Sequence, residues 1–306
     1  MVKKVFVVNI KQDEIQTEVF KDDIRQATNG LYNLEFVDST SWWVSVVGGN
    51  VTVQSKQGRV DLSKSCLFVR SRVDDSPFVG LLSHLCKLQG VLCTDAANQY
   101  HSSFTDKSYA IPRLAQYGLP VPDSIIISNT AFQKNFSAVI EQLTFPCVVK
   151  TSGSRGDNVQ LMQNEEELMR FQLELIAVKD PASLLTIQEF IENSYDVRAL
   201  YFGQKCLGVM RRTRLRDADF VNNASKGAKV ESDILSDAES VLCKQAQAVS
   251  YLDLCGVDFI RTPAGIKFLE INKSPQVDAI RGVVPEISVG AGLVRFIQDN
   301  SANSKS

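Results

Sequence analysis

The chain has little histidine, no paired cysteines and no long apolar run. Two histidines in 306 residues, together with seven singly scattered cysteines, argue against a zinc site. The cysteines also lack the spacing of a redox motif, which indicates free thiols in a reducing compartment. The apolar run after Met1 is too short for a signal peptide or a membrane span, so we expect a cytoplasmic protein.

Neither sign of charge is in excess. The 33 basic and 35 acidic residues give a net charge of −2, which argues against nucleic acid or an anionic membrane as the main partner. With 44% hydrophobic and 22% charged residues, the composition is that of an ordinary globular protein. The length suits two domains, or one domain with subdomains.

Strand and helix patterns alternate over residues 1–95. Continuous apolar runs predict buried strands, and amphipathic stretches between them predict helices. This alternation predicts a small α/β domain with a partly parallel sheet. The predicted strands are 5–10, 34–37, 66–69 and 91–93, the helices are 13–28 and 77–88, and a hairpin joins 42–47 to 51–54 through Gly48, Gly49 and Asn50.

Arg70 follows the predicted strand 66–69. Open α/β sheets bind ligands beyond the carboxyl ends of their strands, and an arginine there can hold a carboxylate with two hydrogen bonds. A solvated loop arginine is the alternative.

The next unit carries a lysine at a strand end. A strand over 146–150 ends in Lys150, a small polar loop with two glycines spans 151–158, and a second strand follows at 159–162. Such a loop can lay backbone N–H groups over phosphates, although it is not a P-loop. An ordinary turn is the alternative. The flanking elements are helices at 106–117, 130–143 and 165–178 and strands at 124–127 and 184–191.

Four of the six residues from 211 to 216 are arginines. In a chain of net charge −2 this cluster favours an anionic ligand, either phosphate or an acidic substrate, and a solvated basic edge strand is the alternative. A hairpin around Gly203 precedes the cluster. Helices are predicted at 234–252 and 286–299, and a disordered tail at 301–306.

The hairpin at 257–271 carries two acids that face each other. A three-residue turn at 263–265 would place Thr262 opposite Ile266 and Asp258 opposite Glu270. Asn272 then projects from the same face. Facing carboxylates repel unless a cation lies between them, and oxygen ligands suit Mg²⁺. The alternative is that both acids point to solvent and pair with nearby basic residues.

These motifs follow one another in the order of a known superfamily. The chain resembles ATP-grasp enzymes, most closely carboxylate–amine ligases of the RimK and glutathione-synthetase type, from Arg70 to Ile297. The motifs that carry the resemblance are 106–107, 146–150 with 152–156, 188–191, 196–198, 211–212, 219–220 with 222–223, 256–259 and 269–275.

The resemblance implies the architecture. Two α+β lobes would clamp ATP behind an N-terminal α/β domain that precedes the ATP-grasp fold. The implied boundaries are 1–95 for the N-terminal domain, 96–187 for the central lobe, 188–300 for the C-terminal lobe with the metal site, and 301–306 for the tail.

The resemblance also implies roles for individual residues. Two Mg²⁺ ions, replaceable by Mn²⁺, would bind together with ATP. Asp258, Glu270 and Asn272 match metal ligands, and Arg212 or Arg211, with Asn223, matches groups near the transferred phosphoryl. The implied ATP contacts are Lys107, Lys150, Ser154, Gly156, Glu189, Phe190, Ile191 and Asp196, the last at the ribose, and the implied substrate contacts are Arg70 and Arg198.

The implied reaction is amide formation through an acyl phosphate, with ADP and phosphate released. Glutamate or another amino acid would be added to a peptide or protein, or a precursor peptide would be modified. The alternatives are a catalytically silent ATP-binding regulator and a small-molecule kinase of the same superfamily. The resemblance also makes a homodimer or homotetramer an option.

Three departures from the family pattern concern the phosphate and acceptor side. Asp157 and Asn158 stand where a further glycine is usual, and Val221 stands where close relatives often have arginine. The expected pair of glycines beyond Asn223 is Gly227 and Ala228. None of the departures removes a proposed metal ligand.

Overall fold

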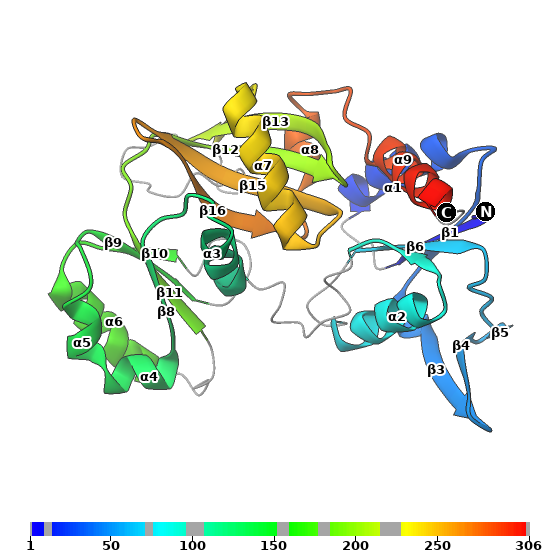
Figure 1. The fold of residues 1–306 in the computed structure, drawn as a ribbon, viewed down its shortest axis with the longest axis horizontal. Helices are drawn as coiled ribbons and strands as arrows, with labels where there is room; N and C mark the ends of the chain where they lie inside the picture. Colours follow the sequence, from blue (N-terminus) through cyan, green and yellow to red (C-terminus); the bar gives the residue numbers. More distant parts are fainter. Residues whose placement is uncertain are drawn as a thin grey trace.

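The computed structural model of the chain describes residues 2–8, 14–70, 76–95, 107–151, 159–176, 184–214 and 228–303. The strands in these ranges form four sheets. In Figure 1 the five-stranded sheet lies between the central sheet, on the left, and the N-terminal domain, on the right. No helix within the described ranges is long and apolar enough to cross a membrane.

The N-terminal sheet has four parallel strands in the order β2, β1, β6, β7. The side chains of the two middle strands are almost all buried, as expected for a parallel sheet covered on both faces. The prediction of a partly parallel sheet is therefore confirmed. The elements are β1 (Lys4–Val8), α1 (Glu14–Thr28), β2 (Asn33–Val37), β6 (Ser65–Val69), α2 (Ser76–Leu88) and β7 (Leu92–Cys93).

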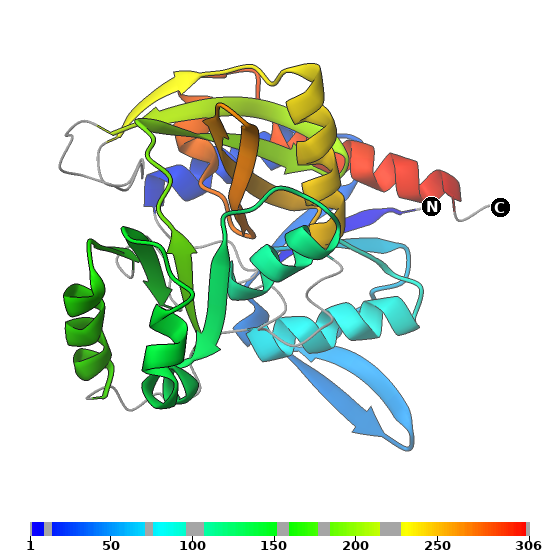
Figure 2. The ribbon, with the colours of Figure 1, turned by 60° about the vertical axis from the view of Figure 1, so that its left-hand side comes forward.

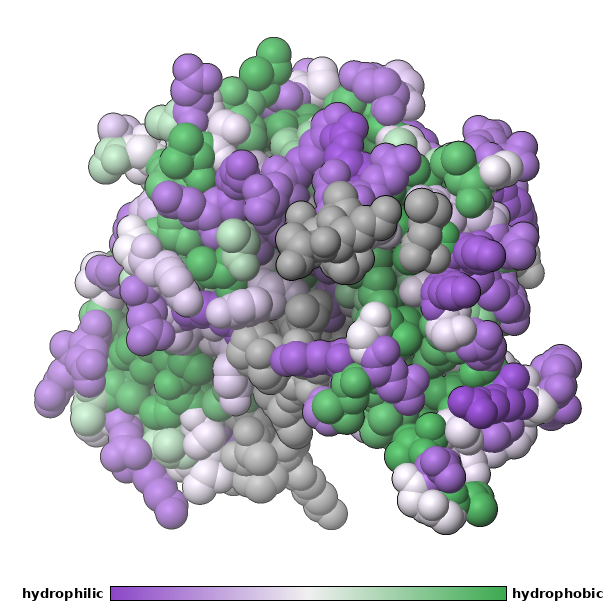
Figure 3. All heavy atoms as spheres, turned by 45° about the vertical axis from the view of Figure 1, so that its right-hand side comes forward, coloured by the Kyte–Doolittle hydropathy of each residue, from purple (hydrophilic) through white to green (hydrophobic). Residues whose placement is uncertain are grey.

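An antiparallel sheet projects from this domain (Figures 1 and 2). It consists of β3 (Trp42–Val47), β4 (Asn50–Ser55) and β5 (Gly58–Arg59), preceded by the short helix η1 (Ser39–Ser41). Gly48 and Gly49 both have positive φ, which a two-residue hairpin turn requires. Near the tip of this sheet Val46 and Val47 are exposed. On the face of the molecule seen in Figure 3, hydrophobic residues lie at the surface among polar ones.

The central sheet is antiparallel, in the order β10, β9, β11, β8, and it has a hydrophobic core of its own that includes Phe132, Val149 and Ile187. The single helix predicted over 130–143 is wrong, because the chain leaves the helix at Asn135, whose side-chain amide donates to the Ala131 carbonyl. The elements are β8 (Ser124–Ser128), α4 (Asn129–Lys134), α5 (Phe136–Ile140), β9 (Cys147–Thr151), β10 (Val159–Met162), α6 (Glu165–Ile176) and β11 (Leu184–Glu189).

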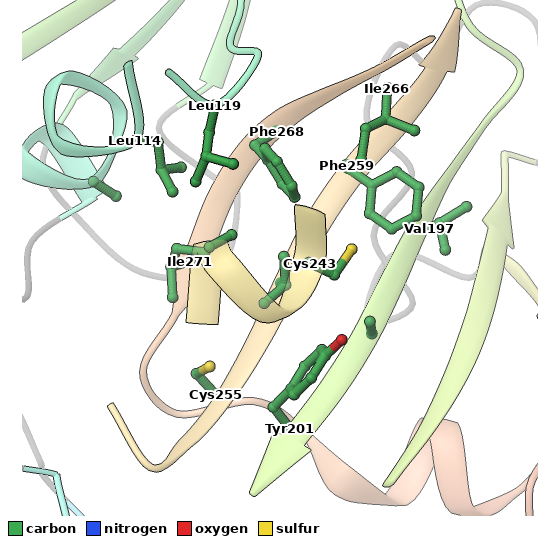
Figure 4. Close-up of a cluster of buried hydrophobic side chains, with 14 of the residues drawn as sticks. Leu114, Leu119, Val197, Tyr201, Cys243, Cys255, Phe259, Ile266, Phe268 and Ile271 are labelled. Carbon is green, nitrogen blue, oxygen red and sulfur yellow. The ribbon is translucent and has the colours of Figure 1, made fainter. Parts of the chain in front are cut away.

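The five-stranded sheet has the order β14, β13, β12, β15, β16. Helices α3 and α7 pack on one face, where Phe259 and Phe268 meet edge to face with ring centroids 6.2 Å apart (Figure 4). Helix α7 begins later than predicted because Ser236 and Glu239 form a capping box. The elements are α3 (Lys107–Gln116), β12 (Tyr195–Phe202), β13 (Lys205–Thr213), β14 (Lys229–Ser232), α7 (Asp237–Ser250), β15 (Leu254–Thr262) and β16 (Gly265–Asn272).

The other face of this sheet shares a core with the N-terminal domain. Val5 of β1, Leu200 of β12 and Ile297 of α9 (Val289–Asn303) belong to one buried cluster, together with residues of α8 (Val277–Arg281). The Asp23 carboxylate of α1 accepts hydrogen bonds from the first amides of α9 at 2.8 and 3.1 Å. Helix α9 continues to Asn303, so the prediction of disorder is wrong for residues 301–303.

Asp95 and Asp253 join the end of β7 to the turn before β15. Each carboxylate accepts a hydrogen bond from the backbone N–H of the other residue at 2.6 Å. Asp95 also accepts from the amide of Leu254 at 3.1 Å. Burial, together with the charge of Asp253, raises the pKa of Asp95 to about 7, and burial raises the pKa of Asp253 to about 6.

We expect Asp95→Asn to stabilise the protein at pH 8 but much less at pH 5. A pKa raised in the folded state means that stability is greatest while the group is protonated and is lost as the pH rises through that pKa. Asparagine keeps the accepting oxygen without the charge, so the gain at pH 8 should be roughly 1–3 kcal/mol. Urea denaturation at both pH values measures it, and an equal effect at the two pH values would contradict the interpretation.

Candidate active site

One face of the five-stranded sheet changes from apolar to charged along its strands. Leu200 and Phe202 of β12 lie in the shared core, and the same face continues to Arg198 and Asp196, because side chains two apart point the same way. The register places Arg198 opposite Asp258 of β15. Charged side chains from several strands therefore meet beside the shared core.

Asp258 lies at the centre of a buried ion-pair network. The guanidinium of Arg198 donates to both of its carboxylate oxygens, from Nε at 2.6 Å and from Nη2 at 2.5 Å. Arg212 of β13 donates from Nη2 to Asp258 at 3.0 Å and from Nε to Asp196 at 2.6 Å. The side chains of Arg198, Arg212, Asp196 and Asp258 are all less than 10% exposed.

Burial and the neighbouring charges shift pKa values within the network in opposite directions. Burial raises the pKa of Asp196 to about 6, although the neighbouring Arg212 lowers it. Burial alone would lower the pKa of Arg212, but the charges of Asp258 and Asp196 raise it above its ordinary value. Arg212 is therefore cationic at any physiological pH.

Arg211 and Arg212 point to opposite faces of β13. Arg211 donates to Glu231 of β14 at 3.1 Å, and its guanidinium lies 5.3 Å from the ring centroid of Tyr195. The sequence left open which of the two arginines approaches the phosphoryl group. Only Arg212 lies beside Asp258, so it is the arginine that we assign to the site in the proposal below.

The hairpin brings Asp258 and Glu270 opposite each other, as predicted, but by a different route. The turn has two residues rather than three, so Thr262 pairs with Gly265 and the predicted pairing with Ile266 is wrong. An irregularity in the register after Asp258 shifts the pairing by one residue and restores the predicted partner. Glu270 Oε1 lies 3.9 Å from Arg198 Nη2, so one guanidinium reaches both acids.

The donor set of this hairpin fits a hard cation. Asp258 and Glu270 offer carboxylate oxygens, and Asn272 on the same strand as Glu270 has an amide oxygen that accepts from the Ser274 N–H at 3.0 Å. Within the described ranges no cluster of three or more His, Cys, Asp or Glu side chains could hold a metal. Two carboxylates suit Mg²⁺ that arrives with phosphate oxygens rather than a metal held by protein ligands alone.

The connecting stretch after β11 is fixed to both neighbouring sheets. The Glu189 carboxylate forms an ion pair with Lys267 of β16 and accepts from the Asp123 N–H at 3.0 Å. Burial would raise the pKa of Glu189, but the hydrogen bond from Lys267 lowers it overall. The N–H groups of Glu189 and Phe190 donate to the carbonyls of Asp123 at 2.9 Å and Pro146 at 3.2 Å, so both amides are already bonded within the protein.

Lys150 lies on β9, opposite Val159 of β10 and Thr186 of β11, and it is half buried. Lys107 is the first residue of α3, and its side chain lies outside the description. Three further predicted residues, Ser154, Gly156 and Asn223, lie outside the described residues.

Arg70 contacts the loop that follows Asn272. Its Nη2 donates to the Pro275 carbonyl at 3.4 Å, and its guanidinium lies 5.2 Å from the ring centroid of Phe20. Burial lowers the pKa of Arg70, whereas the charges of Asp95 and Asp278 raise it. The predicted strand-end arginine is thus close to the chain that carries the metal-ligand candidates.

The sequence reasoning missed Lys267 and the pairing of Arg198 with Asp258. Arg198 was predicted as a substrate contact, yet the structure places its fork on a buried carboxylate. The alternation of Asp196, Arg198 and Leu200 indicated the shared face, but the strand pairing that puts Arg198 opposite Asp258 is not local in sequence. No sequence signal marked Lys267 as the partner of Glu189.

Comparisons with known proteins agree with this geometry. Residues 104–297 match the RimK-like ATP-grasp domain family. A Haemophilus influenzae protein named probable alpha-L-glutamate ligase is 28% identical over 216 residues, which cover 70% of this chain and 68% of that protein. A protein of the same name from Histophilus somni is 32% identical over 178 residues, covering 57% of each chain.

Solved structures share the fold. The ATP-grasp ligase PsnB complexed with a minimal precursor has a TM-score of 0.69 and 16% identity, covering 98% of this chain and 100% of that chain. D-alanine–D-alanine ligase from Bacillus anthracis has a TM-score of 0.66 and 12% identity, covering 99% of this chain and 98% of that chain. The predicted ATP-grasp fold is confirmed.

We expect Arg212→Met to destabilise the protein much more than Arg211→Met. Removing Arg212 leaves Asp196 and Asp258 buried with one partner fewer, which costs roughly 3–5 kcal/mol. Arg211 and its partner Glu231 are each more than 30% exposed, so its loss should cost at most about 1 kcal/mol. Urea denaturation of both variants measures the difference, and similar losses would refute the ion-pair network as a stabilising unit.

Proposed function

Because this chain belongs to the RimK-like ATP-grasp family and is therefore a ligase, we propose that it joins a carboxylate to an amine with ATP as the energy source. The observation that carries the proposal is the buried face where Asp258, Glu270 and two arginines meet beside the hairpin. A sheet that only supports a fold has no need to bring two carboxylates into direct opposition.

The proposed reaction has two steps. An oxygen of the substrate carboxylate attacks the γ-phosphorus of ATP, and ADP leaves, which produces an acyl phosphate. The amine nitrogen then attacks the acyl carbon, phosphate leaves with the bonding electrons, and the nitrogen loses a proton. Positioning and charge stabilisation supply most of the catalysis of phosphoryl transfer.

Asp258, Glu270 and Asn272 would hold Mg²⁺, which neutralises phosphate oxygens and orients the transfer. Two ions, and replacement by Mn²⁺, are part of the proposal. Arg212 fixes Asp258 through Nη2 and brings a permanent positive charge to this face. Asn223 completes the proposed phosphoryl contacts.

The nucleotide would lie between the central sheet and the five-stranded sheet. Lys107, Lys150 and the loop with Ser154 and Gly156 are assigned to the phosphates, and Glu189 to Ile191 to adenine through backbone groups. Because the Glu189 carboxylate is taken by Lys267, only the backbone of this residue suits that role. Asp196 binds Arg212 through Oδ1, so a ribose hydroxyl would use Oδ2.

The proposed substrates follow from the relatives and the solved neighbours. Relatives are named probable alpha-L-glutamate ligases, and PsnB has been solved with a precursor peptide. We infer that the chain adds glutamate or another amino acid to a peptide or protein, or modifies a precursor peptide. The cationic side chain of Arg70, close to Pro275, is assigned to a substrate carboxylate. The boundaries of the three units, a homo-oligomeric state and a cytoplasmic location remain part of the proposal.

Product analysis with Glu270→Gln tests the function. Wild type, incubated with Mg²⁺, ATP, pooled amino acids and a peptide pool, should release ADP only when an amine is present and should yield a product of amide mass. Glu270→Gln should lower this ADP release at least 100-fold, because it removes a charged ligand of the metal.

Glu231→Gln is the matched control, since Glu231 pairs with Arg211 and Lys229 on neighbouring strand positions outside the network. It should react at the wild-type rate. Accumulation of a phosphorylated product without amine dependence would favour the kinase alternative. ATP binding without any ADP release would favour a silent regulator.

A further inference from the structure

Arg198 holds the carboxylate that the metal would need. Nε and Nη2 of Arg198 both donate hydrogen bonds to the Asp258 carboxylate, and Nη2 also lies 3.9 Å from Glu270 Oε1. Arg212 adds a second guanidinium to Asp258. Two of the three proposed metal ligands thus already contact a protein cation.

The fold reserves space for this arrangement. Gly256 lies two residues before Asp258 on the same face of β15, next to the Arg198 side chain. A Cβ at Gly256 would lie 3.2 Å from Arg198 Nε, 3.3 Å from its Cδ and 3.3 Å from the Cβ of Pro275. A side chain at this position would crowd Arg198, so the glycine leaves the room that the Arg198 guanidinium needs to reach Asp258.

A cation fixed at this position opposes a second cation. The attraction of Mg²⁺ to Asp258 and Glu270 is offset by its repulsion from the two guanidinium groups, and a buried site screens that repulsion poorly. Nucleotide phosphates bring negative charge with the metal, and this charge compensates for the guanidinium groups.

We propose that Arg198 makes metal binding depend on nucleotide: without nucleotide it neutralises Asp258 and Glu270 and keeps Mg²⁺ out, and the metal binds only together with phosphates. Arg198 is then a positioning residue for the proposed ligase, not a substrate contact. The inference rests on the metal ligands assigned in the proposed function. By linkage, metal must raise nucleotide affinity by the same factor by which nucleotide raises metal affinity.

Mn²⁺ binding to the nucleotide-free protein tests the inference, with free Mn²⁺ measured by electron paramagnetic resonance. Arg198→Gln should bind Mn²⁺ at least tenfold more tightly than wild type, because one opposing charge is gone. Arg198→Lys keeps the charge and should remain within threefold of wild type. A gain in Arg198→Gln that persists when Glu270→Gln is added would overturn the inference, since the metal would then sit elsewhere.

Arg261→Gln is the matched control. Arg261 also lies on the five-stranded sheet and binds a carboxylate with two nitrogens, donating to Glu239 at 2.6 and 3.1 Å, but away from Asp258. Its loss should leave Mn²⁺ affinity at the wild-type value. Equal Mn²⁺ affinities of Arg198→Gln and wild type, or an equal gain in Arg261→Gln, would overturn the inference.

Wild type alone provides a second measurement if Arg198→Gln does not fold, as judged by circular dichroism. Calorimetry should show that Mn²⁺ raises the ADP affinity of wild type at least tenfold, while Mn²⁺ without ADP binds only at millimolar concentrations. Tight binding of Mn²⁺ to nucleotide-free wild type would overturn the inference. Because no catalysis is measured, metal binding as expected without amine-dependent ADP release would leave the inference standing and refute the proposed ligase activity.

Discussion

The buried carboxylate of Asp258 is the constraint on which the rest of the site depends. A charge at 2% exposure is tolerated only when partners surround it, and Arg198 and Arg212 are those partners. They come from β12 and β13, so the order of strands in the sheet is what makes the charge possible. The same order places Glu270 next to Asp258, where a cation would satisfy both acids.

The sheet serves two purposes along its length. Toward one end its face contributes Leu200, Phe202 and Leu254 to the core shared with the N-terminal domain. Toward the other end the same face carries the ion pairs. The central sheet, in contrast, has a core made only of its own residues among those described. No residue of the central sheet's core belongs to the core that the N-terminal domain shares with the five-stranded sheet.

Much of the fold could be predicted from local patterns, and the site only in part. Apolar runs located the parallel strands, and alternation located the face that carries Asp258 and Glu270. The predicted turn was one residue too long, yet the predicted pair was correct because a register irregularity compensates for it. Strand 229–232 and helix 277–281 were missed, since short elements carry little periodicity. The contacts of Arg198 with Asp258 and of Asp95 with Asp253 join residues 60 and 158 positions apart, which local patterns do not encode.

Residues near the two ends of the chain pack against each other. Val5 and Ile297 belong to one buried cluster, and Asp23 near the start caps the helix that begins at Val289. During synthesis the ribosome releases the first strand long before the last helix exists, so the sheet face that meets Phe20 and Ile24 of α1 lacks its contacts with β12 and α9 until late in translation. The N-terminal domain must therefore complete its core after those elements have emerged, and a chain that stops before α9 leaves part of that apolar face exposed to aggregation.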